Sequence, residues 1–447
     1  MIDRLRIAQV APPLEPVPPP AYGGTERIVG ELSAELHGRG HAVTTFASGD
    51  SGVPGCLVPT VPRALWPAGF TGDPAPWMIA TIQTVLARAA EFDLIHSHLE
   101  WYSSLLAAAS PVPVVTTFHG RMDVPWAAPL LRADRGAHVA ISRAQADTQP
   151  DARWAAVIHN GLSLAGLPLG RERGDGLAFV GRIAPEKGVV EAIDVALLAG
   201  RQLRIAAKAG STASEREYLD DAFRPALKRA GSNVEWLGEL SVDDRNRLFG
   251  ESAATLMTGG WPEPFGLVAI ESLACGTPVI ARPVGALPEI VRAGRDGFFG
   301  DDVAGLAAMV GRVGELDPAA IRASVIERFS AERMTDEYES LYRKLLEPGP
   351  GRPTARAVGP AGGFRARPNI AVATAMPGSF TGAATPGVPV ARPGPLRRQG
   401  RNEMPSWLAV SPPEGATDEP APEPSASPAE APEGGPDPAA TGARSAG

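Results

Sequence analysis

The stretch LAFVGRIAPEKG, residues 177–188, has the pattern on which the fold prediction depends. Its first four residues, 177–180, are apolar and predict a short buried strand, and the loop that follows leads into the next helical pattern. The same order of strand, loop and helix opens the chain at residues 5–10 and 25–37. A strand–helix alternation that starts twice predicts two parallel sheets with helices on both faces.

Further strand candidates fall into two groups along the chain. In the first helix, Thr25 can act as N-cap and Gly38 ends the helix. A last amphipathic helix, residues 331–347, is expected to pack back across both groups. We therefore predict an α/β fold of two Rossmann-like, doubly wound domains, residues 1–165 and 166–330, which face each other across a cleft. The other strand candidates are residues 42–47, 94–96, 112–118, 139–141 and 156–159 in the first domain, and 203–207, 234–237, 254–257 and 278–281 in the second.

The composition separates a globular part from a C-terminal segment. The chain has 447 residues, of which 44% are hydrophobic, and this is enough for large cores. Residues 348–447 contain 20 prolines and 15 glycines and few large apolar residues. Such a segment cannot bury enough surface to offset the entropy lost on ordering. We predict a disordered tail, which is either a solvated extension or a docking segment around the apolar residues 404–410.

Composition also excludes several classes of protein. Two cysteines, Cys56 and Cys275, are too few for a disulfide scaffold and indicate reduced thiols in a cytoplasmic protein. A net charge of −8 disfavours a nucleic-acid partner. No apolar run approaches the roughly 18 residues of an integral membrane segment, and residues 1–10 lack the apolar stretch of a signal peptide.

Two loops after predicted strands of the first domain carry candidate binding residues, because open parallel sheets bind ligands beyond the carboxyl ends of their strands. Gly23 and Gly24 let a ligand approach the backbone at a helix start, or they simply form a tight turn. His119 can bond a sugar hydroxyl or be satisfied by backbone. His96 and His98 are assigned mainly a structural or acceptor-side role, since no metal-ligand set lies near them in the sequence.

The loop after the first strand of the second domain carries two cations. Arg182 and Lys187 precede a helical pattern, where Arg offers bidentate contacts and Lys a point charge. This arrangement suits a diphosphate, and the alternative is an exposed basic loop. The glycine spacing is not that of a Walker P-loop.

The segment EPFGLVAIE, residues 263–271, is the most specific stretch of the chain. Pro264 near the start and Gly276 after the end bracket an apolar helix. Glu263 is expected in the loop before this helix and Glu271 about two turns inside it. Eight helical steps would span roughly 12 Å, about the distance from a sugar to a ribose across a diphosphate. One carboxylate can then bind the sugar and the other the ribose, and the alternative is a surface acid plus a capping acid. The backbone N–H groups expected to meet the phosphates belong to Phe265, Gly266 and Leu267.

Four segments together resemble a known family, the retaining glycosyltransferases of family 4, which have the GT-B fold. They stand in the order and spacing of that family, and the likeness covers about residues 5–346. The segment at 263–281 is highly specific, and the tail, residues 348–447, lies outside the likeness. The four segments are GGTERIVGEL at 23–32, TFHG at 117–120, FVGRIAPEKG at 179–188 and EPFGLVAIESLACGTPVIA at 263–281.

The resemblance implies transfer of a sugar from a nucleotide-diphospho-sugar to an acceptor hydroxyl. It implies that Glu263 binds the donor sugar, that Glu271 binds the ribose, and that Arg182 and Lys187 neutralise the diphosphate. It further implies contacts of His119 near the 6-position of the sugar and of Gly24 with the donor phosphate.

The mechanism implied is front-face substitution with retention, in which the leaving phosphate oxygen accepts the proton of the acceptor. No Asp-x-Asp occurs in the chain, so we predict no metal, and no cofactor is indicated. Two other functions stay open, a nucleotide-sugar epimerase of the same fold and a non-catalytic nucleotide-sugar-binding scaffold. The acceptor stays open as well: a carbohydrate, a lipid-linked molecule or a small molecule.

Overall fold

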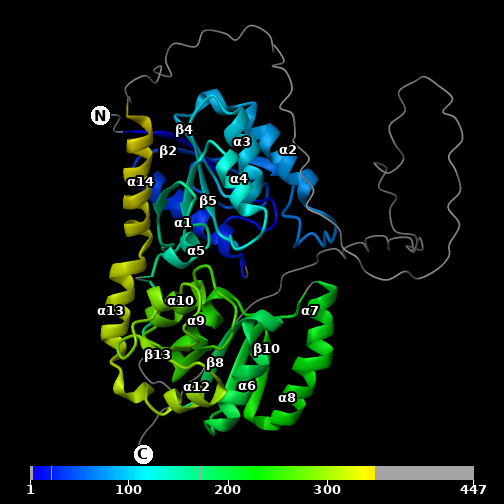
Figure 1. The fold of residues 1–447 in the computed structure, drawn as a ribbon, viewed down its shortest axis with the longest axis vertical. Helices are drawn as coiled ribbons and strands as arrows, with labels where there is room; N and C mark the ends of the chain where they lie inside the picture. Colours follow the sequence, from blue (N-terminus) through cyan, green and yellow to red (C-terminus); the bar gives the residue numbers. More distant parts are fainter. Residues whose placement is uncertain (1–3, 22, 165, 171–173, 211, 348–447) are drawn as a thin grey trace, which may run out of the picture. The chain divides into compact units, whose positions relative to one another are not determined.

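The computed structural model describes residues 4–21, 23–164, 166–170, 174–210 and 212–347. In this part, the chain forms a seven-stranded and a six-stranded sheet, both parallel (Figure 1). The predicted α/β class and two-sheet arrangement are confirmed. The first sheet contains β1 (Arg6–Val10), β2 (Ala42–Ser48), β3 (Cys56–Val61), β4 (Leu94–Ser97), β5 (Val114–Phe118), β6 (Ala137–Ala140) and β7 (Trp154–Val157), in the order β3-β2-β1-β4-β5-β6-β7. The second contains β8 (Leu177–Arg182), β9 (Leu203–Lys208), β10 (Val234–Gly238), β11 (Ala254–Met257), β12 (Val279–Ala281) and β13 (Gly297–Phe299), in the order β10-β9-β8-β11-β12-β13.

Helices follow most strands, as a parallel sheet requires of its crossover connections. Gly276, which was predicted to follow the apolar helix of the second half, lies just after α10 with φ of +77°. The helices are α1 (Gly24–Gly38), α2 (Ala75–Leu86), α3 (Ser103–Ala109), α4 (Ala127–Ala133), α5 (Arg143–Asp147), α6 (Val189–Leu198), α7 (Ala213–Tyr218), α8 (Arg224–Ala230), α9 (Val242–Glu251), α10 (Leu267–Ala274), α11 (Leu287–Ile290), α12 (Val303–Val310), α13 (Pro318–Phe329) and α14 (Ala331–Leu346).

Both faces of each sheet are buried, and neighbouring residues of one strand show this directly. In β1, Ile7 belongs to a core cluster with α1, whereas Ala8 belongs to a different cluster with α2. In β12, Val279 packs with α10 and Ile280 with α6 and α12. Side chains alternate across a strand, so a strand with two separate cores must be covered on both sides.

The sequence missed two edge strands, and their composition explains why. Strand β3 lies at the edge of the first sheet and contains Pro59, which cannot donate to a ladder and is tolerated only at such an edge. Strand β13 has only three residues and lies at the edge of the second sheet. Strands β6 and β7 each begin two residues before the predicted start, because edge-proximal strands carry a weaker apolar pattern than central ones.

Helix α14 packs against the first sheet through two tyrosines. Its Tyr338 hydroxyl bonds Thr117 Oγ1 at 2.8 Å, and its Tyr342 hydroxyl bonds His96 Nδ1 at 2.7 Å. His96 also bonds Thr117 through Nε2 at 2.8 Å. The four side chains are fully buried, so His96 has the structural role expected of it.

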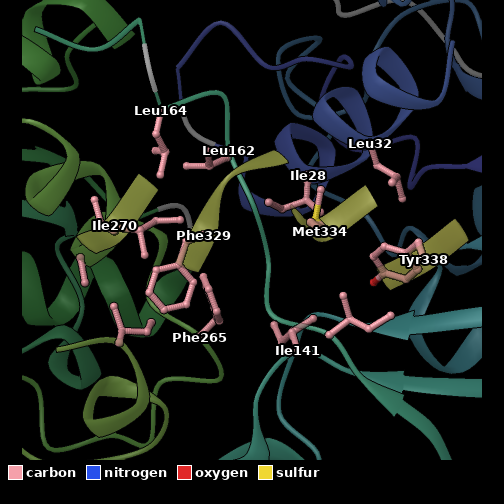
Figure 2. Close-up of a cluster of buried hydrophobic side chains, with 14 of the residues drawn as sticks. Ile28, Leu32, Ile141, Leu162, Leu164, Phe265, Ile270, Phe329, Met334 and Tyr338 are labelled. Atoms are coloured by element: carbon pink, nitrogen blue, oxygen red, sulfur yellow. The ribbon is translucent and has the colours of Figure 1, made fainter. Parts of the chain in front are cut away.

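One hydrophobic cluster includes side chains from both halves of the chain (Figure 2). Ile28 and Leu32 of α1 lie near Met334 of α14, while Phe265 and Phe329 pack in the same cluster from the second half. The backbone joins them too, since Leu162 N–H donates to the Phe329 carbonyl at 3.0 Å. The core therefore continues through the segment that connects the two sheets.

Several sequence predictions are not decided by these elements. The boundary between residues 165 and 166 stays a prediction, and the proposed tail, residues 348–447, lies outside the described residues. Among the helices that the structure describes, none combines the length and apolarity needed to cross a bilayer.

Substitutions of Tyr338 test how strongly α14 is anchored. Tyr338→Ala is expected to lower the free energy of unfolding by about 3–5 kcal/mol, the usual loss for a buried aromatic ring. Tyr338→Phe removes only the hydroxyl and should cost about 1 kcal/mol. Urea unfolding measures both, with Ser340→Ala on the exposed side of the same helix as control. A loss below about 1 kcal/mol for Tyr338→Ala would contradict the anchoring role.

Candidate active site

A cleft with a volume of about 440 Å³ lies where loops of the two sheets come together. Loops after β1, β4 and β5 line it from the first sheet, and loops after β8 and β11 line it from the second. The site is thus at the carboxyl ends of the parallel strands, as was expected for this fold. Its volume is within the range of roughly 300–1,000 Å³ that small-molecule sites have.

The structure brings together all but one of the predicted site residues. Arg182 is the exception, because it does not line the cleft and its guanidinium faces Glu186 at 2.8 Å and Glu215. Contact between Arg182 and a diphosphate would require that Arg182 leave these carboxylates. The residues that line the cleft as predicted are Gly23, Gly24, His119, Lys187, Glu263, Pro264, Phe265, Gly266, Leu267 and Glu271.

The loop before α1 packs against the start of α10. Gly23 has φ of +150° and is the N-cap of α1, and a Cβ there would lie 2.8 Å from Pro19. A Cβ on Gly24 would lie 3.3 Å from Leu267 Cδ1. The prediction that Thr25 caps α1 is wrong, because the tight approach at this turn requires a glycine at the cap position and no side chain caps the helix.

Glu263 lies in the loop before α10, as the sequence predicted, because the helix begins at Leu267 after Gly266 with φ of +109°. Glu271 lies about one turn inside the helix rather than the predicted two. Only the second half of the stretch from Glu263 to Glu271 is helical, and the estimate of roughly 12 Å from eight helical steps is therefore wrong. Leu267 and Val268 at the start of α10 line the cleft, whereas Ala269 N–H donates to the Gly266 carbonyl at 3.0 Å. The first N–H groups of a helix have no carbonyl partner within it.

Glu271 is a buried carboxylate held by two arginines. It is 2% exposed, and its Oε1 accepts hydrogen bonds from Arg245 Nη2 at 2.7 Å and from Arg27 Nη1. Arg27 belongs to α1 and Arg245 to α9, so the two cations come from different halves of the chain. Burial lowers the pKa of Arg27 and lowers that of Arg245 to about 10. Both arginines stay charged at neutral pH, and the buried carboxylate has the partners that it needs.

Lys187 and Glu263 form the second charged pair of the cleft. Lys187 Nζ lies 2.7 Å from Glu263 Oε2 and 3.0 Å from Oε1. Gly188, with φ of +70°, makes the contact possible, since a Cβ there would lie 2.6 Å from the backbone nitrogen of Gly259. The loops after β8 and β11 therefore touch, and their charged side chains meet across the contact.

His119 is neutral and held from behind by a second histidine. Its Nε2 lies 2.9 Å from Nδ1 of His98, and His98 Nε2 lies 3.1 Å from Gln9 Oε1. Burial lowers the pKa of His119 to about 4 and that of His98 well below its usual value. His119 can therefore donate or accept a hydrogen bond at neutral pH but brings no positive charge to the cleft.

Glu100 is a site residue that the sequence did not reveal. It lines the cleft, has φ of +51°, and accepts through Oε1 from the backbone N–H groups of His119 at 2.8 Å and Gly120 at 3.1 Å. Burial raises its pKa to about 7. A non-glycine residue in the left-handed region is uncommon and needs support from its surroundings, which here are the two N–H groups.

Glu26, in the first turn of α1, is a further buried acid that lines the cleft. It is 4% exposed, as is Glu15 on the loop after β1. Burial and the neighbouring Glu15 charge raise the pKa of the Glu26 carboxyl to about 8.

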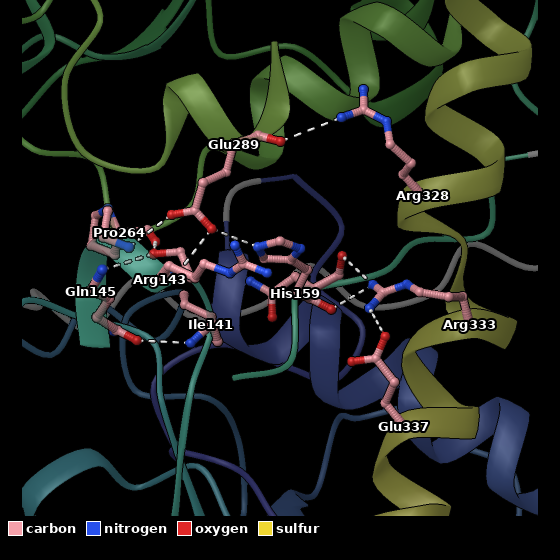
Figure 3. A network of polar contacts seen from close by, with 12 residues as sticks. Ile141, Arg143, Gln145, His159, Pro264, Glu289, Arg328, Arg333 and Glu337 are labelled. Carbon is pink, nitrogen blue, oxygen red and sulfur yellow. Dashed lines mark hydrogen bonds and ion pairs between the residues drawn. The ribbon is translucent and has the colours of Figure 1, made fainter. Parts of the chain in front are cut away.

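A polar network next to the cleft joins the two halves (Figure 3). Glu289 of α11 accepts from the backbone N–H groups of Arg143 at 3.0 Å and Ala144 at 2.8 Å, and pairs with His159 Nε2 at 2.8 Å. Ser142 Oγ donates to the Pro264 carbonyl at 2.7 Å. The segment that carries Glu263 is thereby fixed against the loop after β6.

Sequence reasoning missed three of the charged residues now placed at the cleft. The sequence position of Arg27 could have indicated a site residue, because Arg27 follows the glycine turn at Gly23 and Gly24 by one helical turn and therefore lies close to it. Arg245 and Glu100 had none, because their neighbours come from distant parts of the chain. Within the described part of the chain, no group of three or more His, Cys, Asp or Glu side chains could hold a metal ion.

Two family models match the chain. Residues 22–165 match the model described as Glycosyltransferase Family 4, and residues 171–313 match the model described as Glycosyl transferases group 1. The two matches meet between the last strand of the first sheet and the first strand of the second.

Several individual proteins are similar to the chain in sequence or in structure. A glycogen synthase of Mycobacterium tuberculosis is 28% identical over 382 residues, which cover 72% of this chain and 89% of that protein. AviGT4, a glycosyltransferase involved in avilamycin A biosynthesis, has a TM-score of 0.57 and 26% identity and covers 76% of this chain and 98% of its own. HepE of Anabaena, solved with UDP-glucose, has a TM-score of 0.59 and 18% identity, with 76% of this chain and all of the other covered, and shows likeness of fold alone.

Glu26→Gln tests the buried acid at the start of α1. The pKa of Glu26 rises from 4.5 to about 8 in the folded protein, so its stabilising contribution is full at low pH and is lost as pH rises through 8. The free energy of unfolding of Glu26→Gln, relative to the unchanged protein, should therefore rise by about 2–5 kcal/mol between about pH 5 and pH 9. Glu332→Gln, at an exposed acid in the first turn of α14, is the control and should show no such trend. A pH-independent difference for Glu26→Gln would contradict the assignment.

Proposed function

The chain belongs to family 4 of the retaining glycosyltransferases, and from that premise we propose that it transfers a sugar from a nucleotide-diphospho-sugar to an acceptor hydroxyl with retention of anomeric configuration. One observation carries the proposal. The cleft holds a cation for phosphate, Lys187, beside two carboxylates for hydroxyl groups, Glu263 and Glu271. A nucleotide-diphospho-sugar presents those groups in the order sugar, diphosphate, ribose.

The ribose is assigned to Glu271. Its carboxylate is fixed by Arg27 and Arg245, so its position does not depend on the ligand. A carboxylate accepts hydrogen bonds from two neighbouring hydroxyls, which is the arrangement of a ribose diol. Glu271 is buried one turn inside α10, so on this assignment the diphosphate lies close to the N–H groups of the first turn.

The diphosphate is assigned to the first turn of α10, to Gly24 and to Lys187. Helix N-termini attract anions through free N–H groups and the helix dipole. Gly24 leaves room for a phosphate, since a Cβ there would already be in close contact with Leu267. Lys187 pairs with Glu263, and we expect the diphosphate to replace that carboxylate. Arg182 would join only after leaving Glu186 and Glu215.

Glu263 is then free to bind the hydroxyls of the donor sugar, and His119 lies on the opposite side of the cleft. Because His119 is neutral, it can bond the sugar near its 6-position but does not supply a positive charge. The acceptor proton goes to the leaving phosphate oxygen, as front-face substitution requires. Lys187 and the α10 N–H groups stabilise the negative charge that grows on this oxygen.

Two substitutions separate the roles of the glutamates. Glu263→Gln is expected mainly to lower kcat, because positive charge grows on the sugar as the glycosidic bond breaks. Glu271→Gln is expected mainly to raise the donor KM, because the ribose is remote from the broken bond. A lost charge-assisted hydrogen bond corresponds to about 1.5–3 kcal/mol, or roughly 10- to 150-fold in either parameter.

Free nucleoside diphosphate provides the control, since it has a ribose but no sugar. Calorimetry should find its affinity reduced by Glu271→Gln and nearly unchanged by Glu263→Gln. Glu271→Gln also removes the carboxylate from two buried arginines, so its melting temperature is measured alongside. A reduced affinity for Glu263→Gln with no change for Glu271→Gln would reverse the two roles. Consumption of the donor without an acceptor would indicate an epimerase instead.

Activity is expected to survive chelation, because Lys187 and the first turn of α10 are available to the diphosphate charge. Excess EDTA should leave the rate of nucleotide release within about twofold, a change of less than roughly 0.5 kcal/mol in the barrier. The measurement uses the donor that gives the largest melting shift among UDP-, GDP- and ADP-sugars. Loss of activity that magnesium or manganese restores would overturn the diphosphate assignment.

A further inference from the structure

We propose that the acceptor is an uncharged sugar whose ring stacks on Trp66, and that the acceptor end of the cleft excludes acceptors that carry a phosphate group. The inference rests on the proposed glycosyl transfer and adds the chemical class of the acceptor. Its evidence is the distribution of charge and of apolar surface along the cleft, which differs between the two ends.

Every basic side chain among the described residues that line the cleft lies at the donor end. These are Lys187, Arg27 and Arg245, and each is already paired with Glu263 or Glu271. The remaining lining of the first half contributes the acids Glu26 and Glu100 and, within the described residues, no further lysine or arginine. A phosphate placed there would find no cation and would face carboxyl groups.

Two cations near the cleft do not alter this distribution. Arg121 pairs with Asp123, and its guanidinium lies 4.2 Å from the ring of Trp261 rather than in the lining. Lys208 lies 3.9 Å from Glu239 and also attracts the buried Glu15. Both cations therefore already face acids outside the cleft.

Part of the cleft lining that the first half of the chain contributes is apolar and partly aromatic. It consists of Leu14, Trp66, Met78, Leu99 and Tyr102, and we call it the acceptor wall. Trp66 is 48% exposed although it lines the cleft, whereas Met78 and Leu99 of the same wall are buried. A large aromatic ring that stays open within a ligand cleft is a surface on which the apolar face of a sugar ring can stack.

Backbone contacts hold Trp66 in place before any acceptor arrives. Trp66 N–H donates to the Leu14 carbonyl at 3.0 Å, and Leu65 N–H donates to the Pro13 carbonyl at 3.0 Å. The loop after β1 is also tied to the loop after β2, since Val17 N–H donates to Ser51 Oγ at 2.9 Å. A surface that is already ordered loses little entropy on binding, which favours a small ligand with few contacts.

Glu100 supplies the polar contact that a sugar needs next to this wall. Its Oε1 takes the N–H groups of His119 and Gly120, which fixes the direction of the carboxyl group. We expect its other oxygen to bind an acceptor hydroxyl beside the donor sugar. A phosphate ester at this place would find a carboxyl group and no lysine or arginine among the described lining residues of the first half other than Arg27, which is paired with Glu271, whereas a neutral sugar can donate a hydroxyl to Glu100.

The test compares neutral sugars with their phosphate esters on the full chain. The pairs are glucose and glucose 6-phosphate, fructose and fructose 6-phosphate, and myo-inositol and inositol 1-phosphate, with phenyl β-glucoside as a larger neutral probe. Nucleoside diphosphate release gives kcat/KM, and saturation-transfer NMR with nucleoside diphosphate present gives binding. We expect the neutral member of each pair to bind and react better than its ester by at least about tenfold, since tenfold is the effect of one unfavourable contact of ordinary size.

Trp66→Ala should raise the KM for neutral acceptors by roughly tenfold and leave nucleoside diphosphate affinity unchanged. Trp77→Ala is the matched control, because Trp77 is 39% exposed but does not line the cleft. An ester that binds or reacts as well as its parent overturns the inference, and so does a Trp66→Ala acceptor KM within twofold of the unchanged protein. Neutral probes that neither bind nor react, while nucleoside diphosphate binds, overturn it too. A protein that binds no nucleoside diphosphate at all would instead contradict the proposed function.

Discussion

A carboxylate out of contact with water has to be paired, and the structure around the cleft depends on how Glu271 is paired. Its two arginine partners come from α1 and α9, so a single buried charge links a helix of the first half to two helices of the second. Removing one partner from such a cluster leaves an uncompensated charge, which costs more than the intact cluster contributes. The separation of the two halves at the donor end is therefore set by this contact and by the core that runs beneath it.

The charged side chains at the donor end of the cleft are paired with one another. Lys187 balances Glu263, and the two arginines balance Glu271. On the proposed pose, a donor binds by exchange. Its diphosphate replaces the Glu263 carboxylate on Lys187, and its sugar hydroxyls donate hydrogen bonds to the carboxylate that is released. A ligand with the diphosphate but no sugar completes only half of this exchange. Full use of both groups then requires the whole donor, which is a source of selectivity that single contacts do not provide.

The parts of the fold that could be predicted from sequence are those with a local cause. Central strands such as β1 and β8 are buried on both faces and show as apolar runs, whereas the edge strand β3 contains a proline and shows no such run. Gly266 illustrates the limit within the site, because a single left-handed residue ends the helical geometry that the apolar pattern suggested. Glu100 shows the limit across the chain, since its partners are backbone groups of a different strand end. Contacts of that kind have no signature in a single sequence.

The acceptor end of the cleft differs from the donor end in its charge and in the contacts that hold its shape. Its charge is low because two acids are buried with raised pKa values, and its shape is held by backbone hydrogen bonds rather than by exchangeable ion pairs. The prolines before Gly23 contribute to this, since each removes a backbone donor and restricts the chain, so few remaining contacts are enough to fix the loop. The apolar acceptor wall would select an acceptor by its shape, whereas the paired charges at the donor end would select a donor by exchange of their partners. The two substrates of the proposed reaction would thus be recognised by independent physical means, and changes in the loop after β1 could alter the acceptor without disturbing the donor.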